Sequence, residues 1–165
     1  MLREGKRMIT QFKTIDDIAE LIKEYETILM RPTLKLSHPT LYRNRDVGKK
    51  EQMIKGVRVK DWFLSEDHKW VKPHNQMGLS FSASLENLSL VYDMKKRFNP
   101  KKTLNIYWVL EKADIPSGLR FVPDQKNSEH YFLTVTESMQ LTSLISKLKL
   151  LAHRMTIIRD GSKFL

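Results

Sequence analysis

One short segment, Thr103 to Leu110 (TLNIYWVL), constrains the fold of this chain more than any other. It is rich in β-branched and aromatic residues, a composition that favours a mostly buried strand at the centre of a sheet. A central strand needs partners along both edges, so further strands must come from elsewhere in the chain.

The partner strands are predicted from shorter stretches of similar character, bounded by Gly, Pro or polar turns. They are Thr40–Arg43, Val57–Phe63, Gly78–Ser82, Leu119–Val122 and Glu129–Val135, and Met155–Arg159 is a further segment that could close the sheet. Three segments are predicted to lack regular structure: the loop Ser65–Met77, the turn Asp114–Gly118 and the loop Asp124–Ser128.

Helical spacing of apolar residues predicts three helices. Thr14 and Asp17 form a capping-box-like start for an N-terminal helix over residues 14–31, which Pro32 ends. Ser84 can cap a second helix that stops before Pro100, and a third helix runs from Leu141 to Leu151. Strands and helices do not alternate regularly as in parallel sheets, so the predicted fold class is α+β.

The chain has 165 residues and is 41% hydrophobic, which is enough for one core. A single domain over 1–165 is therefore predicted, with residues 1–13 flexible and with Met8 as an alternative start to Met1. The sequence has no cysteine and therefore no disulfide framework or Cys-based zinc site. It also has no apolar run of about 18 residues, so no membrane contact and a cytoplasmic location are predicted.

The charge is strongly basic: 29 Lys and Arg stand against 19 Asp and Glu, a formal net charge of +10. Such a balance attracts polyanions. The densest cluster contains Lys95, Lys96, Arg97, Lys101 and Lys102, which are the candidate nucleic-acid contacts. The alternative interpretation is a solvated basic surface that keeps the protein in solution.

Several common catalytic motifs are missing. The six glycines form neither a phosphate-binding loop nor a dinucleotide fingerprint. His38-Pro39-Thr40 matches half of a two-histidine phosphoesterase signature, and the second half is absent. Glu66, Asp67, His68 and His74 could hold a metal, but a charged surface loop explains them more simply, so no metal site is predicted.

A more specific constellation is spread over three predicted strands: Tyr42-Arg43, then Ser80-Phe81-Ser82, then Glu129-His130-Tyr131. Here the sequence resembles the ADP-ribosyltransferase fold. Members of that fold hold nicotinamide adenine dinucleotide (NAD) with an early Arg, a Ser-x-Ser-like strand end and a late strand containing Glu or His.

Within that fold, the sequence is most similar to small cytoplasmic effector toxins of type VI secretion. Thr40-Leu41-Tyr42-Arg43 looks like their early strand, and Asp114-Ile115-Pro116, His130-Tyr131 and the amphipathic helix that follows are similar to their C-terminal half. The similarity runs from about Thr40 to Arg154. It implies a split β-sheet core with flanking helices, to which this chain adds an extra N-terminal helix.

The resemblance also implies roles for individual residues. Arg43 would contact the pyrophosphate of NAD, because a guanidinium can bind it in a bidentate manner. Ser80 or Ser82 would hydrogen-bond the ribose or support Glu129, and Tyr42 or Tyr131 would face the nicotinamide. The catalytic group is either Glu129, whose carboxylate would stabilise an oxocarbenium-like ribose, or its neighbour His130.

Two function hypotheses follow. The first is a toxin-like or host-modifying ADP-ribosyltransferase or NAD glycohydrolase, with a protein or nucleic-acid acceptor and a cognate inhibitor that blocks its cleft. The second is a small basic nucleic-acid-binding or regulatory protein without catalysis, encoded by a phage or another mobile element.

Overall fold

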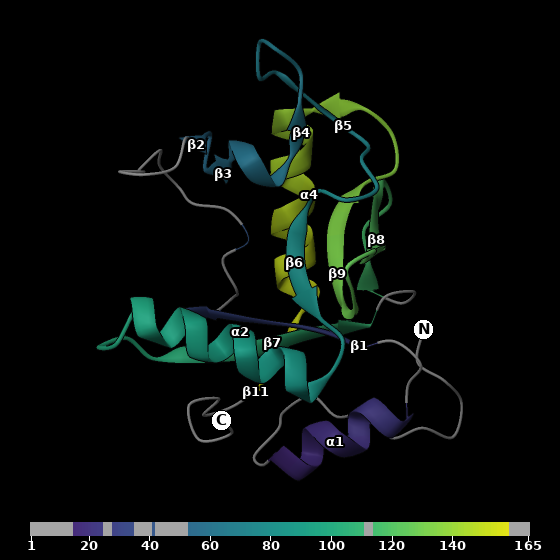
Figure 1. Ribbon diagram of the computed structural model, residues 1–165. Helices are drawn as coiled ribbons and strands as arrows, with labels where there is room; N and C mark the ends of the chain where they lie inside the picture. The colour runs from purple at the N-terminus through teal and green to yellow at the C-terminus, as the bar shows by residue number, and fades with distance from the viewer. Residues whose placement is uncertain (1–14, 25–27, 35–40, 42–52, 111–113, 159–165) are drawn as a thin grey trace.

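The computed structural model describes residues 15–24, 28–34, 41, 53–110 and 114–158 (Figure 1). Its helices are α1 (Ile15–Glu24), α2 (Leu85–Phe98), α4 (Leu141–Arg154) and the 3-10 helix η1 (Val59–Asp61). Its strands are β1 (Ile28–Leu34), β2 (Met53–Ile54), β3 (Val57–Arg58), β4 (Phe63–Leu64), β5 (Trp70–Lys72), β6 (Leu79–Ser82), β7 (Leu104–Leu110), β8 (Leu119–Asp124), β9 (Asn127–Val135), β10 (Met139–Gln140) and β11 (Thr156–Ile158). The α+β class predicted from the sequence is confirmed.

The main sheet has six strands in the order β11-β7-β1-β6-β9-β8, and all neighbouring strands are antiparallel. Strand β7 lies between β11 and β1, and all of its residues are buried, as predicted for Thr103–Leu110. Strands β1 and β6 pair only at Met30 and Ser82. The sheet therefore has two halves, and Figure 1 shows β6, β9 and β8 crossing the direction of β1 and β7.

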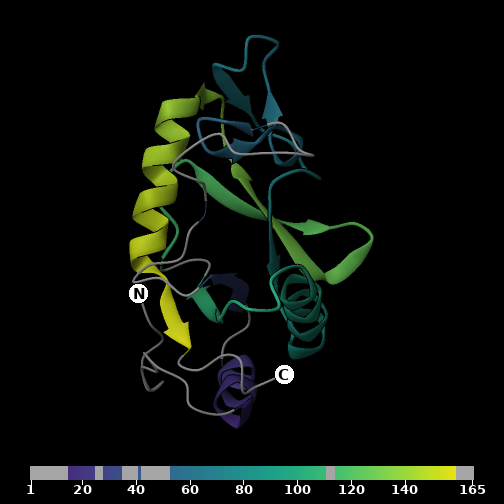
Figure 2. The ribbon, with the colours of Figure 1, turned by 90° about the vertical axis from the view of Figure 1, so that its left-hand side faces the viewer.

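Two apolar cores lie on opposite faces of this sheet. Helix α4 covers the first core, which includes Leu29, Phe81, Tyr107, Val109, Phe121, Leu133, Leu144, Leu148 and Leu151. Helices α1 and α2 cover the second core, which includes Ile18, Met30, Leu88, Tyr92, Ile106 and Trp108. Figure 2 shows α4 on one side of the sheet and α2 on the other. Alternate residues of β7 enter each core, which explains why all of its residues except Asn105 are apolar.

The predicted N-terminal helix is too long. Helix α1 ends at Glu24, and residues 28–34 form β1, which pairs along its length with β7. Pro32 lies inside this strand instead of ending a helix. A proline removes one donor from a β-ladder, and β1 tolerates this because it pairs with β6 at one residue only.

Two predictions in the segment 57–77 are also wrong. Val57–Phe63 is not one strand, because η1 interrupts it between β3 and β4. Ser65–Met77 is not only a loop, because β5 lies within it and joins the three-stranded sheet β10-β5-β4. The strands β4, β5 and β10 are only two or three residues long, so their sequences show little periodicity from which a strand could be predicted.

Other local predictions are confirmed. The Ser84 hydroxyl accepts a hydrogen bond from the main-chain N–H of Asn87 and caps α2, which ends before Pro100. The edge strand β11, Thr156–Ile158, lies within the predicted segment Met155–Arg159. No helix in the described part of the chain is both long and apolar enough to cross a membrane.

Candidate functional site

The predicted strand Thr40–Arg43 lies almost entirely outside the described residues. Only its Leu41 is described, as a buried residue in a bend rather than in a strand. The cofactor-binding predictions for Tyr42 and Arg43 therefore remain predictions. The other two segments of the constellation are described in full.

These two segments lie on adjacent strands. Ser80, Phe81 and Ser82 of β6 pair with Phe132, Tyr131 and His130 of β9, respectively. On its other edge β6 pairs with β1. An early strand, the Ser-x-Ser strand and the Glu-His-Tyr strand are thus neighbours in the sheet.

The early strand in this arrangement carries an arginine, Arg31. Its Nη1 donates a 2.8 Å hydrogen bond to the main-chain oxygen of Ser80, and its guanidinium carbon lies 6.0 Å from the centre of the Phe81 ring. The Nε atom is buried and has no hydrogen-bond partner among the described residues. A buried donor without an acceptor is costly.

The electrostatic surroundings of Arg31 are mixed. Burial lowers the pKa of Arg31 to about 10, while the charge of Asp61 raises this pKa and the charge of Arg58 lowers it. Asp61 is itself held by Arg58, through hydrogen bonds of 2.8 Å from Nε and Nη2 to its two carboxylate oxygens. The Asp61 carboxylate is thus ion-paired with Arg58 and acts on Arg31 through its charge.

The register of the strands sorts the predicted site residues between the two faces of the sheet. Side chains alternate along a strand, and paired residues point to the same face. Phe81 and Tyr131 are paired, and both contact the core beneath α4. Arg31, next to Met30 and over Phe81, belongs to this face, as does Glu129 by alternation from Tyr131.

Ser82 and His130 are a pair on the opposite face. The buried Ser82 hydroxyl accepts a 2.6 Å hydrogen bond from Asn87, whose side-chain oxygen accepts one of 2.9 Å from Asn127. His130 Nδ1 lies 3.0 Å from Asp124 Oδ2, and the His130 ring packs edge-on against Phe132. These contacts connect α2 to the β8–β9 hairpin, which is a structural task.

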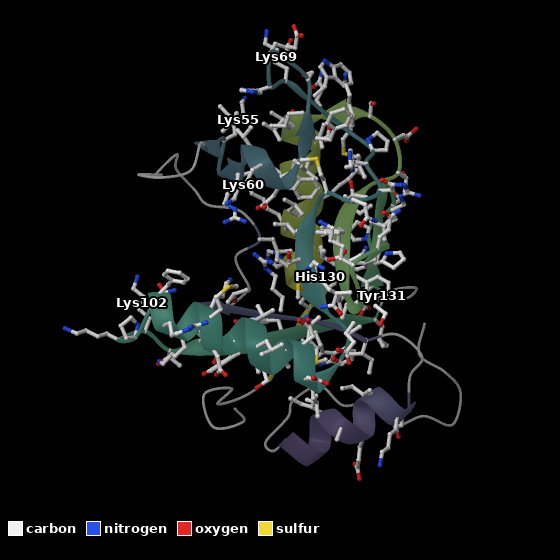
Figure 3. The ribbon with its side chains drawn as sticks, viewed as in Figure 1. Lys55, Lys60, Lys69, Lys102, His130 and Tyr131 are labelled. Atoms are coloured by element: carbon white, nitrogen blue, oxygen red, sulfur yellow. The ribbon has the colours of Figure 1, made fainter. Side chains whose placement is uncertain are left out.

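The two serines and the two catalytic candidates therefore differ in position. Ser80 is exposed, and its main-chain oxygen is the acceptor for Arg31. Glu129 and His130 are both partly buried, and only Glu129 shares a face with Arg31 and Tyr131. Figure 3 shows His130 and Tyr131 together on β9, far from Lys102 at the end of α2.

The predicted nucleic-acid contacts lie at the C-terminal end of α2 and just after it. Two of them are engaged within the protein: Lys95 Nζ donates to the main-chain oxygen of Pro32 and Lys96 Nζ to that of Lys102. Arg97, Lys101 and Lys102 are exposed. Basic residues at a helix C-terminus also interact favourably with the helix dipole, so part of this cluster has a structural explanation.

The charged loop Glu66–His74 has local partners instead of a shared centre. The Asp67 carboxylate accepts hydrogen bonds from the Ser65 hydroxyl and the main-chain N–H of Lys69. His74 Nδ1 accepts one from the main chain of Gln76. Among the described residues, no group of three or more His, Asp or Glu side chains could hold a metal ion.

Comparison with known proteins adds nothing to this geometry, since no family model, no curated protein and no solved structure matches the chain. The site is defined by the strands and contacts described above.

Arg31 and Arg58 are the residues that sequence reasoning missed. The signal for Arg31 was an arginine between Ile28-Leu29-Met30 and Pro32, a stretch that can form a strand. Interpreting Pro32 as a helix stop concealed it. Arg58 has no comparable signal, because its charge acts on Arg31 only in the folded chain.

Proposed function

We propose that this protein is an ADP-ribosyltransferase-like enzyme that binds NAD on the face of β1, β6 and β9 that carries Arg31, and that transfers ADP-ribose or hydrolyses NAD. The observation that carries the proposal is the guanidinium of Arg31, whose buried Nε has no hydrogen-bond partner among the described residues, beside the Ser-x-Ser strand and its neighbour β9. A sheet of two halves joined at a single residue pair is compatible with the split core that the resemblance implies.

In this proposal Arg31 takes the part first assigned to Arg43. Its guanidinium would bind a phosphate oxygen of the dinucleotide, with Arg58 adding positive charge nearby. The partly buried Tyr131 would offer its ring to the nicotinamide or adenine. Ser80 would support the site through the main-chain bond to Arg31, and Ser82 would fix α2 to the sheet.

The chemical step is assigned to Glu129. Cleavage of the bond between nicotinamide and ribose develops positive charge on the sugar, and a nearby carboxylate stabilises that charge. The bond between ribose C1′ and the nicotinamide nitrogen breaks, nicotinamide leaves with the bonding electrons, and water or an acceptor nucleophile forms the new bond to C1′. Glu129 is preferred to His130 because it shares the face of Arg31.

The test uses purified protein with etheno-NAD, whose fluorescence rises when nicotinamide leaves, and a second assay with labelled NAD and cell extract. Arg31→Lys and Glu129→Gln should each lower the rate by at least about 100-fold. Arg120→Lys and Glu137→Gln are the matched controls, because both residues are exposed. Absence of NAD binding, hydrolysis and transfer by the unaltered protein would exclude the proposal.

One further variant separates the two arginine candidates. If Arg43→Lys loses activity and Arg31→Lys keeps it, the assignment to Arg31 is wrong while NAD chemistry survives. The acceptor and any cognate inhibitor follow from the resemblance alone, and the transfer assay with extract is the measurement that would reveal an acceptor.

A further inference from the structure

The small sheet β10-β5-β4 has one face turned to the first core and one turned outward. Val71 and Met139 are buried in the core and Leu64 packs against it. The alternate residues Phe63, Trp70, Lys72 and Gln140 are all exposed. We call these four residues the outer face.

The outer face is unusual because an antiparallel sheet normally turns polar side chains toward water. Phe63 and Trp70 each leave 43% of their surface exposed, although both are large aromatic residues. Phe63 is paired with Lys72, which lies two residues from Trp70 on the same strand. The two aromatic rings and a lysine therefore share one small surface.

Contacts within this surface link the Phe63 ring to Lys72 and to the His74 ring. The Nζ atom of Lys72 lies 5.8 Å from the centre of the Phe63 ring, which is within the range of a cation–π interaction. The His74 ring packs edge-on against Phe63 at 5.3 Å. Lys72 lies over the Phe63 ring and His74 packs against it, while 43% of the Phe63 surface remains exposed.

The surroundings of the outer face are basic. Residues 53–77 contain five Lys and Arg and three Asp and Glu, and two of the three acids are engaged, Asp61 by Arg58 and Asp67 by Ser65. Lys60 and Lys69 are exposed. Figure 3 shows Lys55, Lys60 and Lys69 on the part of the molecule that holds β4, away from Lys102.

We propose that the outer face binds single-stranded nucleic acid, with bases stacked on Phe63 and Trp70 and phosphates contacted by Lys72, Lys60 and Lys69. Exposed aromatic rings set among cations are the chemistry that recognises unpaired bases and their backbone together. A duplex keeps its base faces stacked inside, so it can use the lysines but not the rings. The proposal does not depend on NAD binding.

The experiment measures binding of fluorescent oligonucleotides of about 15 nucleotides, single-stranded DNA and RNA, against a duplex of the same length. Binding should be tighter for the single strands and should weaken at least about tenfold between roughly 50 and 200 mM salt. The intrinsic tryptophan fluorescence should also be quenched on binding. Trp62 and Trp108 are buried, so the quenched residue would be Trp70.

Substitutions identify the surface. Phe63→Ala and Trp70→Ala should each weaken single-strand binding by about tenfold, through loss of a stacked base. The matched control is Phe98→Ala, since Phe98 is more exposed than either, at 80%, and lies within the cluster at the end of α2. Trp70→Phe, which keeps a ring, should retain most of the binding and serves if an alanine variant fails to fold.

Three outcomes would overturn the proposal. One is no single-strand binding at low salt, which would leave the outer face as a protein contact. Another is equal or tighter binding of the duplex. The third is loss of binding in Lys101→Ala with Lys102→Ala while Phe63→Ala and Trp70→Ala bind normally, which would assign binding to the end of α2 by charge alone.

Discussion

The Nη1 atom of Arg31 donates a 2.8 Å hydrogen bond to the main-chain oxygen of Ser80. This bond links β1 and β6 beside their single residue pair, so Arg31 contributes to holding the two halves of the sheet together. Its Nε remains buried without a partner among the described residues. The Arg31 side chain thus makes a structural contact through Nη1 and has a second donor, Nε, that makes no hydrogen bond to a described residue.

Replacing Arg31 by Met is expected to leave the free energy of unfolding unchanged or to raise it by up to about 2 kcal/mol, since buried charges are often less stabilising than apolar side chains. Burial lowers the pKa of Arg31 in the folded state to about 10. A base whose pKa is lower in the folded than in the unfolded state destabilises the folded state while it is charged. This destabilisation falls as the pH rises through the pKa of the folded state.

The measurement is urea unfolding of wild type and Arg31→Met at neutral pH and near pH 10.5. The advantage of the variant should narrow at the higher pH. Arg120→Met, at an exposed position of β8, is the control and should change stability by no more than about 0.5 kcal/mol. A loss above about 1 kcal/mol in Arg31→Met would mean that its bond to Ser80 outweighs its burial.

Gly78 and Gly118 offer a second prediction, because both have positive φ angles, of 156° and 90°. A Cβ at Gly78 would overlap the main-chain oxygen of Leu133 in β9, whereas at Gly118 it would meet the flexible ends of Lys147 and Met139. Gly78→Ala should therefore destabilise by about 3 kcal/mol or more and Gly118→Ala by about 1 to 2. Equal losses in thermal unfolding would contradict this ordering.

The sequence predicted those elements whose local signals agree with their place in the fold. Thr103–Leu110 was recognisable because a strand buried on both faces is apolar throughout, and α2 because Ser84 caps it. The prediction from Pro32 was wrong, because a proline after an apolar stretch can end a helix or lie in a strand. In β1 the proline lies in a strand that pairs with β6 at one residue only.

The candidate site was predicted less completely, for a different reason. The Ser80–Ser82 and Glu129–Tyr131 segments lie on adjacent strands, but which of their side chains share a face depends on strand register. Register placed Ser82 and His130 away from Tyr131. The partnership of Arg31 with Arg58 and Asp61 requires the tertiary fold, since more than twenty residues separate them in the sequence.

Asn87 supports a third prediction. It is buried, donates to the Ser82 hydroxyl and accepts from Asn127. Asn87→Ala should destabilise by about 2 kcal/mol, because it leaves the buried Ser82 hydroxyl without this partner. Ser82→Ala should lower the free energy of unfolding less in the Asn87→Ala background than in the wild type. The coupling energy from denaturant unfolding should be at least about 0.5 kcal/mol. Strict additivity would show that the two side chains are independent.

Glu129 and His130 give the last prediction, which rests on their opposite faces. Glu129→Gln should lower the rate of NAD cleavage by at least about 100-fold, because its carboxylate is proposed to stabilise the positive charge of the transition state. The same substitution should change the free energy of unfolding little. His130→Ala should retain most of the activity and lose about 1 kcal/mol of stability, because it breaks the 3.0 Å contact with Asp124. Asp124→Ala should lose as much stability as His130→Ala, and the double variant should lose little more.

Steady-state kinetics and denaturant unfolding of these four variants test the assignment of catalysis to Glu129. If His130→Ala is inactive but stable and Glu129→Gln is active, the catalytic face is the one beneath α2 and the ligand assignment to Arg31 fails with it.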